Sequence, residues 1–188
     1  REGDTILVHA AAGGVGLILC QWASAFGATV IGTVSSEAKA DLARANGCHH
    51  PIIYTRQDFV AEVDRLTAGA KLPVVYDSVG RDTFLKSLDC LQPRGMMVSF
   101  GQSSGPVEPF APGLLAQKGS LFLTRPTMYD YVRERGELER SAEALFEAVR
   151  SGKVKADIRQ RFPLAEAAEA HRALEARETS GSTILMID

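Results

Sequence analysis

The clearest chemical pattern in the sequence lies at residues 9–16 (HAAAGGVG), between an apolar stretch and a helical one. Aligned with the fingerprint G-x-G-x-x-G, the three glycine positions fall on Ala11, Gly13 and Gly16. A glycine at position 13 lets a pyrophosphate approach the backbone, and one at position 16 lets the helix pack closely on the strand. The free N–H groups at the helix start favour an anion. The pattern therefore predicts a dinucleotide-binding turn formed by Ala12, Gly13, Gly14, Val15 and Gly16.

Ala11 departs from this fingerprint, so the first turn has to be one that tolerates a Cβ atom. The alternative interpretation is an ordinary glycine-rich connection between a strand and a helix, with no ligand. The position of the turn, followed by four further strand–helix units, favours nucleotide binding.

The end of the second expected strand distinguishes between the two nicotinamide dinucleotides. Residues 32–36 (GTVSS) contain no Asp or Glu, the residue type that binds the ribose 2′-hydroxyl of NAD and would repel a 2′-phosphate. Ser35 and Ser36 offer hydroxyl groups, and Lys39, one helical turn beyond Ser35, offers a positive charge. We therefore expect NADP(H). The alternative is that the serines only cap the helix and that Lys39 is a solvated surface residue.

These residues have to be positioned by regular elements, and short apolar runs that alternate with amphipathic stretches predict βαβ units. Strands are expected at residues 5–9, 29–34, 52–54, 74–76, 96–100, 120–124, 156–161 and 183–187. Helices are expected at residues 14–26, 37–46, 58–67, 82–90, 137–151 and 164–176, with Asp82 as the cap of the fourth, and residues 101–112 should form a loop. The predicted fold class is α/β of the Rossmann type, a doubly wound parallel sheet of about six strands flanked by helices.

Composition limits the classes of function. The chain has 188 residues, of which 45% are hydrophobic, and a net charge of −2, which suits one well-packed domain and gives no basic face for nucleic acid or an anionic membrane. No apolar run approaches the roughly 20 residues of a membrane span. The three cysteines are far apart, which argues against a metal site and indicates reduced thiols and a cytoplasmic location. The abrupt start with a strand suggests a fragment.

Four stretches together carry a family resemblance: residues 10–16 (AAAGGVG), 76–80 (YDSVG), 98–101 (VSFG) and 119–126 (GSLFLTRP). They resemble the zeta-crystallin-like quinone oxidoreductases, which are zinc-free members of the medium-chain dehydrogenase/reductase superfamily, and bacterial NADPH:quinone reductases look most similar. The resemblance covers essentially the whole chain in the same order. One departure is that Ser35 stands where close relatives often have glycine, which suggests a rearranged contact with the 2′-phosphate.

The resemblance implies further cofactor-binding residues beyond the turn. They lie at carboxyl ends of the expected strands and in the last helix–strand connection: Tyr54 beside Lys39, then Ser78, Phe100, Gly101, Thr124, Arg125, Pro126 and Arg177. Each also has a purely structural interpretation. Tyr54 could be a strand aromatic, Ser78 a turn former, and Arg177 a surface cation near a helix end.

The resemblance also implies the activity, a zinc-independent hydride transfer from NADPH to a quinone. No residue of this chain can be named as a catalytic acid or base. Residues 1–155 would be the NADP-binding Rossmann domain, and residues 156–188 would return toward a GroES-like catalytic domain that is mostly outside this chain. The isolated fragment is therefore expected to be inactive.

The sequence also suggests how the protein assembles and which other functions are compatible with it. The stretch from Ser120 to Thr124 should be an apolar edge strand, and the resemblance implies a homodimer that pairs these strands. One alternative function is a zinc-free reductase of enones or enoyl thioesters, since the acceptor pocket lies mostly elsewhere. The other is a non-enzymatic, NADPH-binding structural or RNA-binding protein, against which the near-neutral charge argues.

Overall fold

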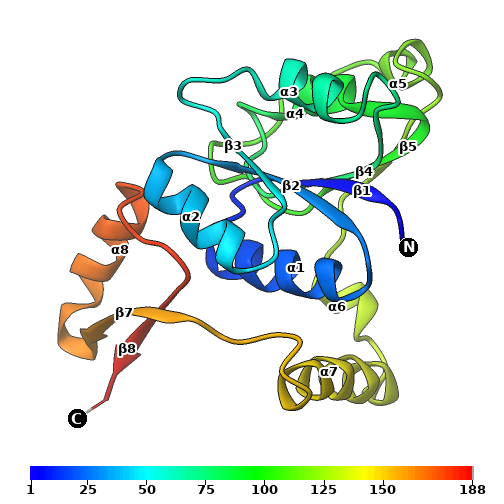
Figure 1. The fold of residues 1–188 in the computed structure, drawn as a ribbon. Helices are drawn as coiled ribbons and strands as arrows, with labels where there is room; N and C mark the ends of the chain where they lie inside the picture. Colours follow the sequence, from blue (N-terminus) through cyan, green and yellow to red (C-terminus); the bar gives the residue numbers. More distant parts are fainter. Residues whose placement is uncertain (188) are drawn as a thin grey trace.

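A computed structural model describes residues 1–187, and its centre is a parallel sheet of six strands in the order β3-β2-β1-β4-β5-β6 (Figure 1). The strands are β1 Thr5–Val8, β2 Thr29–Val34, β3 His50–Ile53, β4 Leu72–Asp77, β5 Leu91–Ser99 and β6 Phe122–Thr124. This order, with a crossover from β3 back to the far side of β1, is that of a Rossmann fold. The predicted fold class is confirmed.

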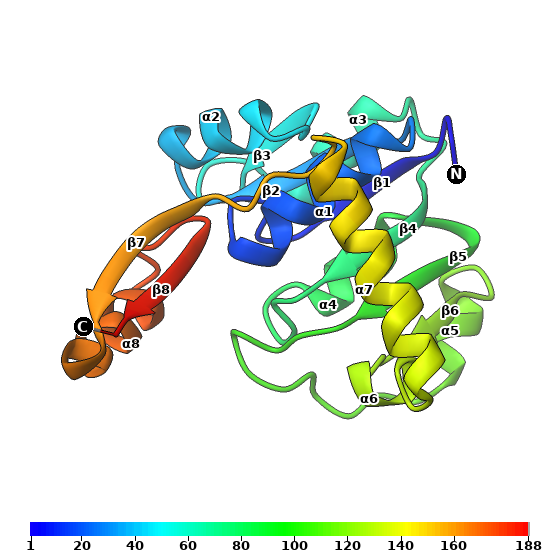
Figure 2. The same ribbon diagram turned by 90° about the horizontal axis from the view of Figure 1, so that it is seen from below.

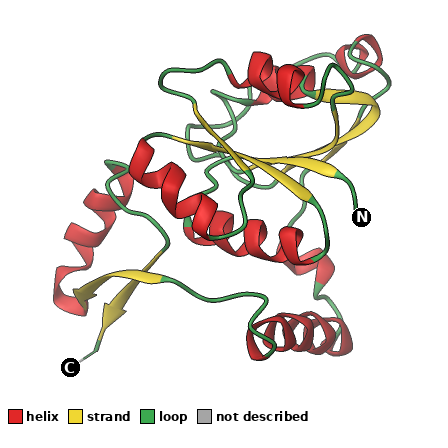
Figure 3. Cartoon of the chain, viewed as in Figure 1, coloured by secondary structure: helices red, strands yellow, loops and turns green. Residues whose placement is uncertain are grey.

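Helices cover both faces of the sheet (Figures 1 and 3). On one side lie α1 Gly14–Ala25, α2 Glu37–Ala45 and α7 Arg135–Arg150, and on the other lie α3 Phe59–Leu66, α4 Phe84–Asp89 and α5 Gly113–Gln117. The short helix α6 Met128–Tyr131 connects β6 to α7. Among residues 1–187, no helix is long and apolar enough to cross a membrane.

The sheet separates two apolar cores because successive side chains of a strand point to opposite faces. Leu7 of β1 and Ile31 of β2 pack with α3 and α4 in one core. Ile6 and Val30, their neighbours in sequence, pack with α1 and α2 in the other. Both faces of the central strands are therefore buried, as is usual for parallel sheets, and the carboxyl ends of these strands are held in fixed positions.

Some local predictions were incomplete or wrong. Residues 113–117 and 128–131 form short helices that periodicity does not predict, because so few residues do not establish a pattern. The predicted cap of α4 by Asp82 is wrong. Thr83 occupies the N-cap position, and the Asp82 carboxylate lies 3.4 Å from Nε of Arg81.

The C-terminal segment forms a small unit beside the sheet (Figure 2). It contains β7 Ile158–Pro163, the 3₁₀ turn Leu164–Glu166, α8 Ala167–Glu175 and β8 Ser182–Met186. β7 and β8 pair in parallel with each other, in a two-stranded sheet separate from the six-stranded one. Figure 2 shows this unit projecting from the β2–β3 side of the molecule.

Candidate functional site

The turn after β1 has the shape that the fingerprint predicts. Ala10 adopts a left-handed conformation, with φ of 53°, and Gly13 is the N-cap of α1. A Cβ atom on Gly16 would lie 2.2 Å from the carbonyl oxygen of Ala10, so only glycine fits there. The close approach of α1 to the turn leaves the first N–H groups of the helix pointing toward the carboxyl ends of the strands.

The structure explains why alanine is tolerated at the first fingerprint position. The Ala11 side chain is completely buried, and a Cβ atom on Gly32 of β2 would lie 2.6 Å from the Cβ of Ala11. Glycine at position 32 therefore leaves the space that the methyl group of Ala11 fills. The alanine at the first fingerprint position is thus accommodated by a glycine on β2.

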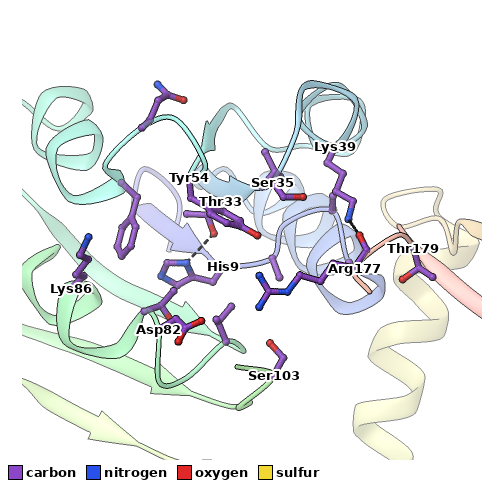
Figure 4. Close-up of a pocket in the computed structure, with 18 of the residues that line it drawn as sticks. His9, Thr33, Ser35, Lys39, Tyr54, Asp82, Lys86, Ser103, Arg177 and Thr179 are labelled. Atoms are coloured by element: carbon purple, nitrogen blue, oxygen red, sulfur yellow. Dashed lines mark hydrogen bonds between the residues drawn. The ribbon is translucent and has the colours of Figure 1, made fainter. Parts of the chain in front are cut away.

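A cavity of about 710 Å³ opens above this turn, at the carboxyl ends of β1, β2 and β4 (Figure 4). This is where open α/β sheets bind ligands. Its walls include six of the predicted site residues, namely Ala12, Gly13, Ser35, Lys39, Tyr54 and Arg177. The walls also include residues that sequence reasoning missed: His9, Ala10, Thr33, Val34, Gln57, Asp58, Phe59, Val79, Asp82, Thr83, Lys86, Ser103, Leu174, Glu175 and Thr179.

Two cationic side chains, Lys39 and Arg177, line one side of the cavity. Nζ of Lys39 donates a hydrogen bond of 2.6 Å to the carbonyl oxygen of Arg177, and the Arg177 side chain extends into the cavity (Figure 4). Partial burial, and after it the nearby charge of Arg177, lower the pKa of Lys39. Two positive charges that line the same cavity favour an anion within reach of both. This side of the cavity is therefore suited to a phosphate group.

The acid at the start of α2 is held away from the cavity. Glu37 begins α2, and its carboxylate accepts a hydrogen bond of 3.1 Å from Nη1 of Arg56. The carboxylate therefore serves the helix start and an exposed ion pair rather than the cavity. The adjacent Ser36 is the N-cap of α2, with its hydroxyl accepting from the backbone N–H of Lys39 at 3.4 Å. Its position fits the structural role that the sequence left open.

The remaining predicted residues lie outside the walls of this cavity. Gly14, Val15 and Gly16 form the first turn of α1. Ser78 and Gly101 lie against each other after β4 and β5, since a Cβ on Gly101 would be 2.6 Å from the Ser78 carbonyl oxygen. Phe100 lies beside them, and the segment Thr124, Arg125 and Pro126 follows at the end of β6. Nη1 of Arg125 bonds the Ser99 carbonyl oxygen at 3.0 Å, which ties that segment to the end of β5.

The C-terminal segment reaches the phosphate-binding turn through its backbone. The N–H of Gly181 donates to the carbonyl oxygen of Ala12 at 2.9 Å, and Gly13 and Gly181 form an isolated parallel bridge. A Cβ on Gly14 would lie 3.2 Å from Oγ of Ser182. The segment that carries Arg177 is therefore fixed against the turn. These contacts bring Arg177 to the cavity although it is 138 residues from Lys39 in the sequence.

A buried polar group that the sequence did not single out lies at the back of the cavity. The ring of His9 accepts or donates at both nitrogens, with Nδ1 2.9 Å from Oγ1 of Thr33 and Nε2 2.9 Å from Oγ of Ser87. The carboxylate of Asp77, also buried, accepts hydrogen bonds from the backbone N–H groups of Val79 and Gly80. Asp77 thus shapes the loop after β4, where sequence reasoning had expected Asp82 to act.

The described residues do not fit a zinc centre. Among residues 1–187, no group of three or more His, Cys, Asp or Glu side chains is arranged to hold a metal ion. Cys20, Cys48 and Cys90 are all buried. Burial raises the pKa of Cys90 to about 12, which keeps it as a thiol rather than the metal-binding thiolate.

Comparison with known proteins agrees with this geometry. The family model for zinc-binding dehydrogenases matches residues 14–147. A quinone oxidoreductase of Pseudomonas aeruginosa is 54% identical over 99% of this chain and 57% of its own length, and a 2-haloacrylate reductase of a Burkholderia species is 48% identical over 99% and 56%. The crystal structure of Escherichia coli quinone oxidoreductase complexed with NADPH superimposes with a TM-score of 0.96 at 49% identity, covering 99% of this chain and 58% of that one.

The chain spans between half and two thirds of the length of these curated relatives. The family match covers most of the chain, from the start of α1 to near the end of α7. The chain therefore belongs to the zinc-binding dehydrogenase family, among the quinone oxidoreductases of the medium-chain dehydrogenase/reductase superfamily.

Proposed function

We propose that the cavity binds NADPH, with the 2′-phosphate between Lys39 and Arg177. The observation that supports this most is that Lys39 and Arg177 line the same cavity, while Glu37, the acid at the start of α2, is paired with Arg56. Ser35 lines the same cavity and offers a hydroxyl group. The NADPH in the Escherichia coli relative's crystal structure supports the same assignment.

The polar and apolar parts of the cavity wall suggest where the other groups of the dinucleotide would lie. The diphosphate would lie on the turn at Ala12 and Gly13, facing the start of α1. The adenine ring would lie toward Phe59 and Val79, where the cavity wall is apolar. The nicotinamide would then extend toward the ends of β4, β5 and β6, where Ser78, Phe100, Gly101 and the segment Thr124, Arg125 and Pro126 are located.

The proposed reaction of the whole protein is reduction of a quinone. Bound NADPH supplies the hydride, and the residues of this chain bind and orient the dinucleotide. The zinc implied by the family's description does not fit the described residues, so no step is assigned to a metal. A reduced quinone anion is delocalised and takes its proton from water, which agrees with the absence of an assigned acid in this chain.

The experiment is a steady-state assay of NADPH oxidation with 1,4-benzoquinone by the full-length protein. We expect saturable activity that is at least about tenfold lower with NADH, because the 2′-phosphate contacts are lost. Absence of quinone-dependent NADPH oxidation in the correctly folded full-length protein would refute the proposed reaction.

A second candidate reaction is reduction of an activated carbon–carbon double bond. The 48% identity to a 2-haloacrylate reductase favours it. The cofactor site described above would serve both reactions equally. Comparison of kcat/KM for 1,4-benzoquinone and for 2-chloroacrylate with the full-length protein separates them, and a higher value for the acrylate would select the second reaction.

We further propose that residues 1–155 form the nucleotide-binding domain and that residues 156–188 belong with a separate catalytic domain. The separate two-stranded sheet of β7 and β8 supports this division. The chain alone would then bind NADPH without reducing quinone, because the nicotinamide would have one wall only. Clear saturable activity of the purified chain with 1,4-benzoquinone would refute this.

A homodimer through β6 is the proposed assembly, and the cytoplasm is the proposed location. β6 is the edge strand of the sheet, and Phe122 and Leu123 on it are exposed. Exposed apolar edges of this kind are normally covered. Light scattering at micromolar concentration tests the assembly, and a monomeric mass would count against it. Buried free cysteines support the reducing location.

A further inference from the structure

The buried polar side chains behind the cavity form one continuous hydrogen-bond chain. It runs from Thr33 at the end of β2, through His9 after β1, to Ser87 in α4 and then to Asp77 at the end of β4 (Figure 4 shows the first bond). All four residues have at most 2% of their surface exposed. The hydrogen-bond chain therefore joins β2, the end of β1, α4 and β4 inside the protein, and no water is needed to complete it.

The chemistry of the last member sets the direction of every bond. The Asp77 carboxylate can only accept, and Ser87 Oγ donates to its Oδ2 at 3.4 Å. Since the single hydroxyl proton of Ser87 is used there, Ser87 must accept from Nε2–H of His9. In a neutral ring protonated at Nε2, Nδ1 carries no proton and accepts from the hydroxyl of Thr33. The hydrogen-bond chain is therefore complete with His9 as a neutral imidazole in its Nε2–H form.

The environment of the ring agrees with a neutral state. Complete burial lowers the pKa of His9, and the charge of Asp77 opposes this only in part. The other close neighbour is apolar, since the ring of Phe59 in α3 lies edge-on with centroids 5.0 Å apart.

Both ends of the hydrogen-bond chain reach residues that line the cavity. Thr33 itself lines it on the β2 side. On the β4 side, Asp77 holds the N–H of Val79 at 2.7 Å and the hydroxyl of Thr83 at 2.7 Å, and both of these residues line the cavity. His9 therefore connects the two walls through side-chain hydrogen bonds, in addition to the backbone pairing of β1 with β2 and β4.

We propose that His9 is a positioning residue for nucleotide binding, which holds the β2 and β4 walls of the cavity at the separation that the adenosine half of NADPH requires. The role rests on the proposed function, because it assumes that a dinucleotide occupies the cavity. Both ring nitrogens are already bonded, so His9 contributes through Thr33 and Asp77 rather than through a hydrogen bond of its own to the ligand. The inference concerns affinity and leaves hydride transfer unchanged.

The test compares two substitutions of His9 that differ in hydrogen bonding. His9→Leu removes the acceptor for the Thr33 hydroxyl and the donor to Ser87 Oγ, whereas His9→Gln keeps one acceptor and one donor. We expect His9→Leu to weaken NADPH binding by about tenfold or more and His9→Gln by less than about threefold. NADH binding should weaken by the same factor, because the 2′-phosphate corner is not involved. In the full-length protein KM for NADPH should rise while kcat is retained.

A matched control separates positioning from general loss of stability. Val63→Ala removes buried atoms from α3 in the same core, outside the hydrogen-bond chain and the cavity walls. It should lower Tm and leave the Kd of NADPH within about twofold. An equal loss of affinity in Val63→Ala and His9→Leu at equal loss of Tm would overturn the positioning role, and so would unchanged affinity in a folded His9→Leu variant.

A measurement without any ligand distinguishes failure of this inference from failure of the proposed function. Nitrogen-15 NMR of the His9 ring should show a protonated Nε2 and a bare Nδ1 throughout pH 6–8. A charged ring or the opposite tautomer would refute the hydrogen-bond chain itself. If the ring is as described and the wild-type chain binds no dinucleotide, the proposed function fails and the positioning role fails with it.

Discussion

The six-stranded sheet and the C-terminal segment 156–187 are both built on parallel strands, but they bury those strands very differently. β1 and β2 have almost every residue buried, whereas β7 and β8 are half-buried or exposed throughout. Among the described residues of the segment, Ala170 alone is fully buried. Parallel strands are normally covered on both faces, so the segment has too little core to be stable by itself.

The comparison teaches that a part of the chain with little core of its own can still contribute residues to the cavity. The segment supplies Arg177 and Gly181 to the site, but its position depends on bonds to the sheet unit. One of these bonds joins the N–H of Gly181 to the carbonyl oxygen of Ala12 at 2.9 Å, and another joins Nζ of Lys39 to the carbonyl oxygen of Arg177 at 2.6 Å. The proposed 2′-phosphate site is thus made by docking one unit against the other.

The largest expected effect comes from the turn on which both units meet. Gly16→Ala would place a Cβ 2.2 Å from the Ala10 carbonyl oxygen, so α1 would have to move away from the turn. We expect a loss of about 3 kcal/mol or more in the free energy of unfolding, together with loss of NADPH binding. Urea denaturation followed by circular dichroism measures the first. Gly113→Ala, which meets no atom within 4 Å, is the control and should be nearly neutral.

Matched leucines in the two units provide the next test. Leu7→Ala in β1 empties a fully buried position and should reduce the free energy of unfolding by about 3 kcal/mol. Leu185 in β8 is 39% exposed, so Leu185→Ala should cost less than about 1 kcal/mol. Equal effects of the two substitutions in the same denaturation experiment would mean that the segment is as tightly packed as the sheet.

Removing one charge from the corner should affect affinity rather than stability. Lys39→Gln takes away one of the two cations, so the Kd of NADPH should rise by about tenfold to a hundredfold while that of NADH changes by less than about threefold. Fluorescence titration of each dinucleotide measures both values. Lys153→Gln, an exposed lysine outside the cavity, should change neither. A parallel loss for NADH would place Lys39 elsewhere on the ligand.

The smallest effect is a dependence of stability on pH that arises within the sheet unit. Burial lowers the pKa of His9 below its ordinary value of 6.5, so the unfolded chain takes up a proton at this residue before the folded one does. The free energy of unfolding should therefore fall as pH decreases below 6.5, by at most about 1.4 kcal/mol per pH unit from this group. Chemical denaturation at pH 5.5, 6.5 and 7.5 measures this.

In His9→Gln that contribution is absent, so the stability of the variant should vary less between pH 6.5 and 5.5 than that of the wild type. An identical dependence in both proteins would show that His9 is not buried as a neutral ring. The segment contains no comparable residue, since His171 in α8 is exposed.

The sheet unit could be predicted well from sequence because its signals are local. Period-two and period-3.6 patterns mark each strand and helix, and the strand–turn–helix around Gly13 fixes where the cleft opens. The prediction that Lys39 contributes to the cofactor site was based on its spacing from the end of β2. Arg177 followed only from family resemblance, because no local pattern connects two residues 138 positions apart.

The hydrogen-bond chain behind the cavity could not be predicted for the same reason. His9 and Ser87 are 78 positions apart, and neither an isolated imidazole nor a helical serine carries a periodic signal. The expected cap at Asp82 failed because α4 begins one residue later, with Thr83 at the N-cap, and the Asp82 carboxylate faces Arg81.

The most direct test of the account is calorimetric titration of this chain with NADPH and with NADH at one ionic strength. The cation pair of Lys39 and Arg177 predicts that NADPH binds at least about tenfold more tightly. Tighter or equal binding of NADH, or no binding of either dinucleotide by a chain whose circular dichroism shows it folded, would contradict it.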